Sequence, residues 1–310
     1  MPLLPFALRR RPPPEALAWV AREVGGGVRV SSVERLRAGT SSAVHLVRLR
    51  DRHGRPLAVV LRRFVRADWL AEEPDAAARE AHVLRAVEAS ALRAPRLIAV
   101  DPDGAACDVP AVLMSRLPGR IDLAPRNVEA YVDAAVTPLL ALHAIGPVAG
   151  VPSYYPYVLG RTQEWRPPRW AHRPRLWRAA ACVLHQPWPE AEPVLIHRDY
   201  HPGNLLWSRG RLSGVTDWVN ASNGPPAMDV AHMRWNLAQL FGIDAAEAFR
   251  QAYESATGRP HHPYWDVLGA LDGGDPVAAQ WQDAGRLDLT EALLIERREA
   301  YLDGLMKRLG

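Results

Sequence analysis

The chain has 310 residues, of which 48% are hydrophobic and 23% are charged, as in an ordinary globular protein. Its two cysteines exclude a disulfide scaffold, and no apolar run reaches the roughly 18 residues of a membrane-spanning helix. The N-terminal stretch MPLLPFALRRRPPP places its charges after its apolar residues, so we expect no secretory signal and a reducing, cytoplasmic location.

The net charge of +4 is unevenly distributed. Residues 1–191 contain 27 basic and 18 acidic residues, whereas residues 192–310 contain 11 basic and 16 acidic residues. A basic part suits phosphate groups, and an acidic part suits a cation. The arginines are scattered and form no single patch with interleaved aromatic residues, so nucleic-acid binding is not expected.

The first part of the chain is predicted to be rich in strands. A helix is expected over 12–24, strands over 28–36, 43–50 and 57–64, a helix over 73–90, and strands over 97–100 and 111–116. The turn RHGRP, residues 52–56, predicts a hairpin between the second and third strands.

The second part is predicted to be mostly helical. Helices are expected over 126–145, 175–185, 227–241, 244–256, 277–284 and 288–308, with short strands over 204–207 and 212–217. The element order predicts an α+β protein with a small, sheet-rich N-lobe, residues 1–117, and a larger helical C-lobe, residues 118–310.

The stretch LIHRDYHPGNLLW, residues 195–207, places several polar side chains in one loop between two apolar pairs. Asp199 and Asn204 lie five residues apart in it, and Asp217 ends the apolar strand that follows. A hairpin over 204–217 would return Asp217 toward Asn204. Carboxylate and amide oxygens suit Mg²⁺. Zinc is a poor alternative, because His197 and His201 have no cysteine partner and no HExxH spacing.

Any one of these polar residues alone would be read as a turn or cap residue that bonds its own backbone. Together, H-x-D-x-x-x-x-N and a following strand that ends in Asp are typical of the catalytic loop and metal-binding Asp of kinases. In that pattern Asp199 would accept a proton from a hydroxyl group.

Three segments, HRDYHPGNLLW, GVTDW and GPPAMDVA, resemble the aminoglycoside phosphotransferase family, which also includes choline kinases and macrolide kinases. The resemblance extends from about residue 30 to residue 240. It implies a two-lobed, protein-kinase-like fold with Asp199 as the catalytic residue, Asn204 and Asp217 as Mg²⁺ ligands, and His197 and Asp229 as supports of the catalytic loop.

The chain departs from the family pattern H-G-D-x-H-P-G-N and G-D-P at two positions. Arg198 replaces the usual glycine, and Pro226 breaks the G-D-P triplet. Neither change removes an expected metal ligand.

A kinase-like fold also needs a loop and a cation for the phosphates of a nucleotide. The turn RAGTSSAVHLV supplies Gly39, which permits close backbone approach, and the hydroxyl and N–H groups of Thr40, Ser41 and Ser42. The cation is usually a lysine, but the only lysine is Lys307.

The third strand, LAVVLRRF, offers Arg62 or Arg63 instead. Alternation along the strand does not decide between them, and the family's V-L-R pattern points to Arg62. Glu80 lies on the apolar face of its helix, where a carboxylate needs a partner, so we expect an Arg62–Glu80 pair. The segment VLMSRLPG resembles the hinge strand, which implies nucleotide contacts from Met114, Ser115 and Leu117.

These features predict transfer of the γ-phosphoryl group of ATP or GTP, with Mg²⁺, to a hydroxyl of a small molecule. The acidic second part favours an aminoglycoside-like antibiotic or another amine-bearing metabolite, recognised by Asp266, Asp272, Asp275 and Trp281.

Three alternatives remain. The acceptor could be a macrolide or simple alcohol. It could be a protein, as the HRD triplet suggests, although Trp218 and Val219 stand where protein kinases have Phe-Gly and no APE segment follows. The chain could also be an inactive nucleotide-binding interaction protein, because Arg62 replaces lysine.

Overall fold

The computed structural model describes residues 8, 10–36, 42–160, 165–283 and 285–309. The chain divides into two compact units. The first unit contains Met1–Pro118 and Gly214–Asn220, and the second contains Gly119–Ser213 and Ala221–Gly310. The chain therefore returns to the first unit at Gly214, beyond the expected range of 1–117, and Asp217 belongs to that unit.

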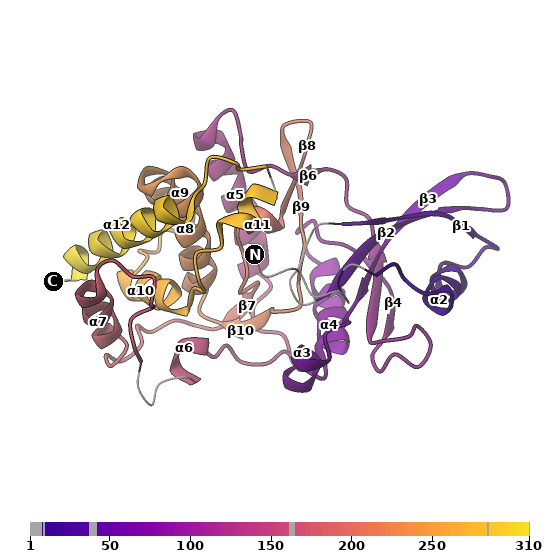
Figure 1. The fold of residues 1–310 in the computed structure, drawn as a ribbon, viewed down its shortest axis with the longest axis horizontal. Helices are drawn as coiled ribbons and strands as arrows, with labels where there is room; N and C mark the ends of the chain where they lie inside the picture. The colour runs from indigo at the N-terminus through magenta and orange to yellow at the C-terminus, as the bar shows by residue number, and fades with distance from the viewer. Residues whose placement is uncertain (1–7, 9, 37–41, 161–164, 284, 310) are drawn as a thin grey trace. The chain divides into compact units, whose positions relative to one another are not determined.

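The first unit is built on an antiparallel sheet, part of which is labelled in Figure 1. The sheet has five strands in the order β1-β2-β3-β5-β4. Its elements are α2 (Pro14–Val24), β1 (Arg29–Arg35), β2 (Ala43–Arg50), β3 (Pro56–Arg63), α3 (Ala67–Glu72), α4 (Ala76–Glu88), β4 (Leu97–Asp101) and β5 (Ala111–Ser115). The predicted strands and the two predicted helices are present, and the short helix α3 was not predicted.

The two faces of this sheet have different partners. Alternate residues of β2 and β3, such as Val47 and Leu61, pack with Trp19 and Val20 of α2 in one apolar cluster. Arg62 lies next to Leu61 in the strand and therefore points to the opposite face, where it meets Glu80 of α4. The period of two in β3 thus places Arg62 on the face that meets α4 and Leu61 on the face that meets α2.

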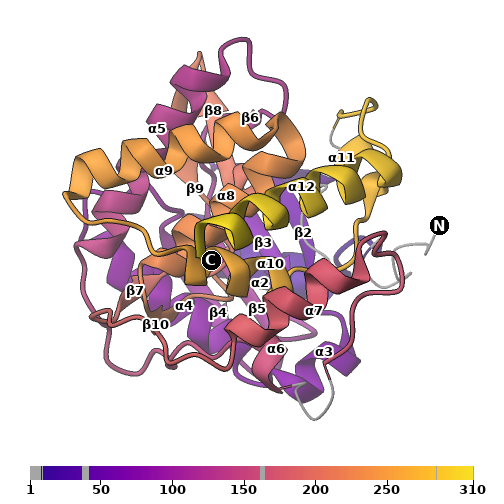
Figure 2. The same ribbon diagram turned by 90° about the vertical axis from the view of Figure 1, so that its left-hand side faces the viewer.

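The second unit is mainly helical. Its helices are α5 (Val128–His143), α6 (Tyr157–Gly160), α7 (Pro174–Val183), α8 (Ala227–Phe241), α9 (Ile243–Thr257), α10 (Pro263–Asp272), α11 (Ala278–Asp283) and α12 (Glu291–Leu309). Helix α8 contacts α9, α10 and α12, and most of its residues are buried, which places it at the centre of the unit (Figure 2).

Two small sheets lie beside these helices. Strand β7 (Val194–Ile196) pairs with β10 (Ser222–Gly224), and β6 (Arg120–Ile121), β8 (Leu205–Ser208) and β9 (Arg211–Val215) form the other sheet. Arg209 and Gly210, with φ values of 52° and 73°, form the two-residue turn between β8 and β9, which is the geometry favoured in tight hairpins.

The predicted α+β class is confirmed, and the helix expected over 227–241 is found as α8. Helix α10 was missed, since the histidines and prolines before it indicated a loop. Pro263 instead occupies the first turn, where a proline is tolerated, and the His262 side chain accepts a hydrogen bond from Tyr264 N. Among the described residues, no helix combines the length and apolar character that crossing a bilayer requires.

Candidate active site

The loop between β7 and β8 carries the predicted catalytic residues. His197 and Tyr200 are fully buried, and the Tyr200 hydroxyl donates a 2.6 Å hydrogen bond to the carbonyl oxygen of Ala135 in α5. Pro202–Asn204 then form one turn of 3-10 helix. Buried anchors on both sides therefore hold Asp199, whose side chain is 30% exposed.

Asp229, in the first turn of α8, fixes the backbone of this loop. Its carboxylate is fully buried and accepts hydrogen bonds from the N–H groups of His197 (2.9 Å) and Arg198 (2.7 Å). His143 Nε2 adds a third contact at 3.1 Å, while its Nδ1 lies 3.0 Å from the Tyr253 hydroxyl. Several donors compensate the cost of burying this carboxylate, and the expected supporting contact is present.

The backbone conformation at Arg198 explains why the family pattern has a glycine at this position. Its φ of 67° lies in the left-handed region, which disfavours residues with a Cβ. The side chain is held by its surroundings: the guanidinium carbon is 4.0 Å from the centre of the Tyr157 ring and 5.4 Å from that of Tyr154, and Nη2 donates to Tyr155 O at 2.8 Å. These contacts offset the strain and tie the loop to the segment before α6.

The carboxylate of Asp199 is held at both oxygens. Asn204 Nδ2 donates to Asp199 Oδ2 at 3.2 Å and to the Asp199 carbonyl oxygen at 2.9 Å. His232 Nε2 lies 3.1 Å from Oδ1, and His201 Nε2 lies 3.6 Å from the same atom. The amide nitrogen of Asn204 therefore faces Asp199.

These neighbours set the pKa of Asp199. Burial alone would raise it, but the electrostatic interactions with the imidazoles of His201, His232 and His197 and the hydrogen bond with His232 outweigh burial and hold the pKa of this carboxyl well below its usual range. Asp199 is therefore ionised at neutral pH and is able to accept a hydrogen bond from a hydroxyl group.

His232 is a site residue that the sequence analysis missed. It lies in α8, three residues after Asp229, so both side chains lie on the same face of the helix. Its spacing from Asp229 was the available signal. The loop motif alone could not reveal it, because His232 is 33 positions from Asp199 in the sequence.

The first unit contains a second charged group of residues. Arg62 Nε lies 3.3 Å from Glu80 Oε2, as expected, and Arg62 Nη1 donates to Asp217 Oδ1 at 2.7 Å. Arg62 and Glu80 are 5% and 0% exposed. Arg63 points to the other face of the sheet, where its Nε donates to Asp108 Oδ1 at 2.8 Å. The structure thus decides between the two arginines that alternation left open.

One guanidinium faces two carboxylates in this triad. Burial raises the pKa of Glu80 to about 7, Arg62 opposes this shift, and the charge of Asp217 adds to it. The carboxylate oxygens of Asp217 are donors of the type that Mg²⁺ prefers. In the second unit, the amide oxygen of Asn204 is a donor of the same kind. Each residue, taken by itself, therefore fits magnesium by its chemistry.

The expected nucleotide loop is only partly described. Gly39, Thr40 and Ser41 lie outside the described residues, and Ser42 is buried. In the predicted hinge, Met114 is buried and lies between Val60 and Leu97 in the sheet register.

Ser115 is tied into the sheet. Its N–H donates to Arg96 O at 2.8 Å, and its hydroxyl accepts from Arg96 N at 2.8 Å. The N–H of Ser115 is therefore engaged within the sheet. Leu117, beyond the end of β5, is half-buried.

Asp266 does not fit its expected role. It is 1% exposed, is hydrogen-bonded to Arg234, which is itself fully buried, and lies 2.9 Å from His261 Nε2. Its charge is compensated within the helices of the second unit, so it is not available to steer an acceptor. The expectation failed because helix α10, which buries Asp266, was read as a loop.

The other three residues expected at the acceptor, Asp272, Asp275 and Trp281, lie in different surroundings. Asp272 ends α10, and its Oδ1 accepts from Val158 N at 2.6 Å. Trp281 is buried in an apolar cluster with Leu240, and its ring centre is 6.1 Å from that of His201.

Asp275 is exposed and accepts a 2.9 Å hydrogen bond from Trp170 Nε1. It lines a cavity of about 400 Å³ together with Trp165, Arg166, Pro168, Trp170, Trp177, Leu271, Gly273 and Gly274.

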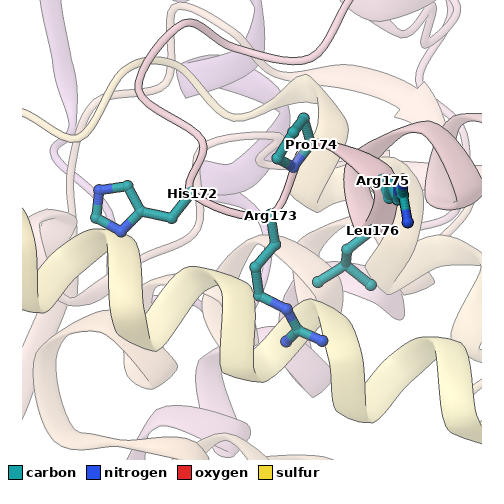
Figure 3. Close-up of a pocket in the computed structure, with 5 residues that line it drawn as sticks. All are labelled: His172, Arg173, Pro174, Arg175 and Leu176. Carbon is teal, nitrogen blue, oxygen red and sulfur yellow. The ribbon is translucent and has the colours of Figure 1, made fainter.

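A second cavity, of about 520 Å³, lies at the start of α7 and is lined by His172, Arg173, Pro174, Arg175 and Leu176 (Figure 3). The basic residues of this cavity would attract an anion, but two acidic side chains already contact Arg173. Glu299 Oε1 accepts from Arg173 N at 2.8 Å, and Arg173 Nη2 is 2.6 Å from Asp303 Oδ1, so both acids come from α12. This cavity is a packing feature of α7 and α12.

The chain belongs to the phosphotransferase enzyme family, whose model matches residues 32–271. No curated protein matches the chain in sequence. Among solved structures, the apo form of a thermostable mutant of aminoglycoside phosphotransferase APH(4)-Ia superposes with a TM-score of 0.63 at 19% identity, covering 93% of this chain and 98% of that one.

A macrolide 2'-phosphotransferase, MphH from Brachybacterium faecium, gives a TM-score of 0.56 at 20% identity, with 93% and 98% coverage. A ternary complex of the APH(4)-Ia mutant with ADP and hygromycin B gives 0.59 at 18% identity, with 88% and 94% coverage. The predicted family and kinase-like fold are confirmed: this protein is a member of the phosphotransferase enzyme family.

Proposed function

We propose that this phosphotransferase moves the γ-phosphoryl group of ATP or GTP to a hydroxyl group of an amine-bearing small molecule. The observation that carries the proposal is the setting of Asp199. Its ionised carboxylate is partly exposed, is held at both oxygens, and lies in a loop whose backbone is fixed by the buried Asp229. A fixed, ionised carboxylate is what a hydroxyl acceptor needs as its base.

In this mechanism Asp199 orients the acceptor hydroxyl through a hydrogen bond and takes its proton as the new oxygen–phosphorus bond forms. The bond between the γ-phosphorus and the β,γ-bridging oxygen breaks, and ADP or GDP leaves with that oxygen. His197 and Asp229 keep the loop in place and take no part in the proton transfer. Asn204 in the second unit and Asp217 in the first are proposed as ligands of Mg²⁺, which when bound neutralises charge on the phosphate oxygens.

Arg62 is proposed to position the phosphates in place of the usual lysine. A guanidinium has five N–H donors in a rigid fork, so it can hold carboxylates and a phosphate oxygen at the same time. Glu80 fixes the guanidinium from α4. The turn of Gly39, Thr40, Ser41 and Ser42 is proposed to cover the phosphates, and Met114, Ser115 and Leu117 to contact the base.

The preference for an amine-bearing acceptor rests on fewer residues than the sequence indicated. Asp275 supports it, since an exposed carboxylate and three tryptophans line one cavity, and cations bind to both carboxylates and aromatic faces. Asp272 and Trp281 are kept as candidates, whereas Asp266 is not.

The free thiols of Cys107 and Cys182 agree with a reducing, cytoplasmic setting.

The test is transfer of label from γ-³²P-ATP or γ-³²P-GTP, with Mg²⁺, to a panel of aminoglycosides, macrolides, simple amino alcohols and a generic protein substrate. We expect labelled product with a cationic small molecule and a KM for it that rises with salt concentration. Labelling of a macrolide or neutral alcohol instead, with a salt-independent KM, would show that the acceptor is not an amine-bearing small molecule recognised by its charge. Absence of any transfer alongside tight nucleotide binding would favour an inactive binding protein.

A further inference from the structure

Helix α8 contacts the catalytic loop twice from one face. Asp229 binds two backbone N–H groups of the loop, and His232, one turn further along, reaches the side chain of Asp199. The helix is otherwise almost entirely buried, so its position in the second unit is fixed by packing. The same rigid element therefore holds both the backbone of the loop and the carboxylate of its central residue.

The contacts to the carboxylate divide between its two oxygens. Oδ2 receives the amide of Asn204 from within the loop, at 3.2 Å, and Oδ1 receives His232 from outside it, at 3.1 Å. Since terminal torsions of Asp side chains have broad wells, a single contact would leave the carboxylate able to rotate. Contacts at opposite oxygens from two different elements remove that freedom.

We propose that His232 is a positioning residue for the phosphoryl transfer. Its Nε2–H donates to Asp199 Oδ1 and fixes the rotation of the carboxylate, so that the remaining lone pairs face an incoming hydroxyl group. The proposal rests on the proposed role of Asp199 as the base. His232 acts through Asp199, and its imidazole stays a donor throughout the transfer.

The same three side chains could also be read as a metal site, because ligand atoms of Asp199, His201 and His232 all lie within 4.8 Å of one another. The hydrogen bonding of His201 argues against that reading. Its Nδ1 accepts the N–H of Gly203 at 3.1 Å, so the proton of the neutral ring lies on Nε2. A protonated Nε2 donates to a carboxylate and does not ligate a metal.

A purely structural role for His232 would make a different prediction. The side chain is 31% exposed, so most of it is buried, and a structural role predicts that its removal lowers the melting temperature. The proposal instead predicts that its removal alters the chemical step and leaves nucleotide binding and folding nearly unchanged.

The experiment compares His232→Leu, which removes the donor, with His232→Gln, which keeps an N–H group on a side chain of similar reach. The exposed His185, in the same unit, gives the control His185→Leu. We expect kcat to fall roughly 10- to 100-fold in His232→Leu, the worth of one hydrogen bond to a charged group, and less in His232→Gln. The nucleotide Kd and the melting temperature should stay at the values of the control.

A double-mutant comparison tests whether His232 acts through the carboxylate of Asp199. In an Asp199→Asn background, His232→Leu should cause little further loss of kcat, because the carboxylate that it positions is gone. The same fold loss in both backgrounds, or equal losses for the Leu and Gln variants, would overturn the proposal.

A measurement without turnover separates this proposal from the proposed function. ¹⁵N chemical shifts of the His232 imidazole should show a protonated Nε2 that changes on Asp199→Asn and does not change on Asp244→Asn, an exposed site. An Nε2 that is unaffected by Asp199→Asn would overturn the contact itself. Full turnover in Asp199→Asn, with the contact intact in the parent protein, would overturn the role of Asp199 as base and therefore also the positioning role of His232, which rests on it.

Discussion

The two units hold their charged residues in contrasting ways. In the first unit, Arg62 lies buried between Glu80 and Asp217, so that one cation is shared by two carboxyl groups. In the second unit, Asp199 is partly exposed and is surrounded by donors, two imidazoles and an amide. The first arrangement is an ion-pair network, and the second is a single carboxylate fixed in place.

The difference follows from what each arrangement has to do. A buried cation between two carboxylates is costly to disturb and suits the rigid placement of a ligand's phosphates. A carboxylate that takes a proton must remain reachable by its substrate, so it is stabilised by hydrogen bonds and not by burial against an opposite charge. Substitutions in the first unit should therefore affect folding and nucleotide binding, whereas those in the second should affect turnover.

The largest effect is expected for Asp199→Ala. Turnover with the best acceptor should fall by roughly 10²–10⁴-fold, the usual contribution of a positioned base, with the nucleotide Kd nearly unchanged. Asp244→Ala, at an exposed position in α9, is the matched control. Full turnover in Asp199→Ala would place the base elsewhere and remove the contrast between the units.

Arg62→Ala should be strongly destabilising, by about 3–5 kcal/mol, because it leaves two carboxylates without their cation. Glu80→Gln in the same background should recover part of this loss, and the two changes should also be non-additive in nucleotide affinity. Chemical denaturation measures the change in stability, and a double-mutant cycle of nucleotide affinities measures the non-additivity. Arg48→Ala, which breaks only an exposed pair with Glu34, should cost under about 1 kcal/mol. Simple additivity would show that the triad is not one unit.

The pH dependence of stability tests the same triad through Glu80. Because burial raises its pKa to about 7 from an ordinary value of 4.5, the folded protein retains the proton of Glu80 over this interval and the unfolded chain does not. The free energy of unfolding should therefore decline as pH rises from about 4.5 to 7, by up to roughly 3 kcal/mol from this group. Glu80→Gln should flatten this part of the curve for the nucleotide-free protein. An unchanged slope would mean that Glu80 stays ionised.

Asp217→Asn should weaken Mg²⁺-dependent nucleotide binding by about tenfold, since it removes a negative oxygen ligand but keeps the size of the side chain. Calorimetric titrations with and without Mg²⁺ provide their own control, because binding without the metal should change little. If the metal strengthens binding to the variant as much as to the parent protein, Mg²⁺ is held by other residues.

The smallest effect concerns Arg198, where two substitutions separate backbone strain from side-chain contacts. Arg198→Ala keeps a Cβ at φ 67° and loses the contacts with Tyr157 and Tyr155, so it should destabilise by about 1–2 kcal/mol. Arg198→Gly loses the same contacts but relieves the strain, and should be about 1 kcal/mol more stable than the alanine variant. Equal stabilities would show that this backbone conformation is not strained.

The sequence by itself determined the elements whose signal is local. The segments that form β2, β3 and α8 were predicted within one residue at each end. The loop of Asp199 and Asn204 was also visible, because its residues lie within a few positions of one another. So was the need of Glu80 for a cationic partner, since a carboxylate on the apolar face of a helix has to be paired.

Only the tertiary structure decided which side chains meet across long stretches of chain. Alternation put Arg62 and Arg63 on opposite faces of β3 but could not tell which face would meet α4. Helix α10 had local signals that also suit a loop, and only packing against α8 shows that Asp266 is buried beside Arg234. His232 reaches Asp199 because the burial of α8 fixes one helix face against the catalytic loop. The physical reason is the same in each case: periodicity determines the direction of a side chain within its own element, whereas its partner is determined by how that element packs against others.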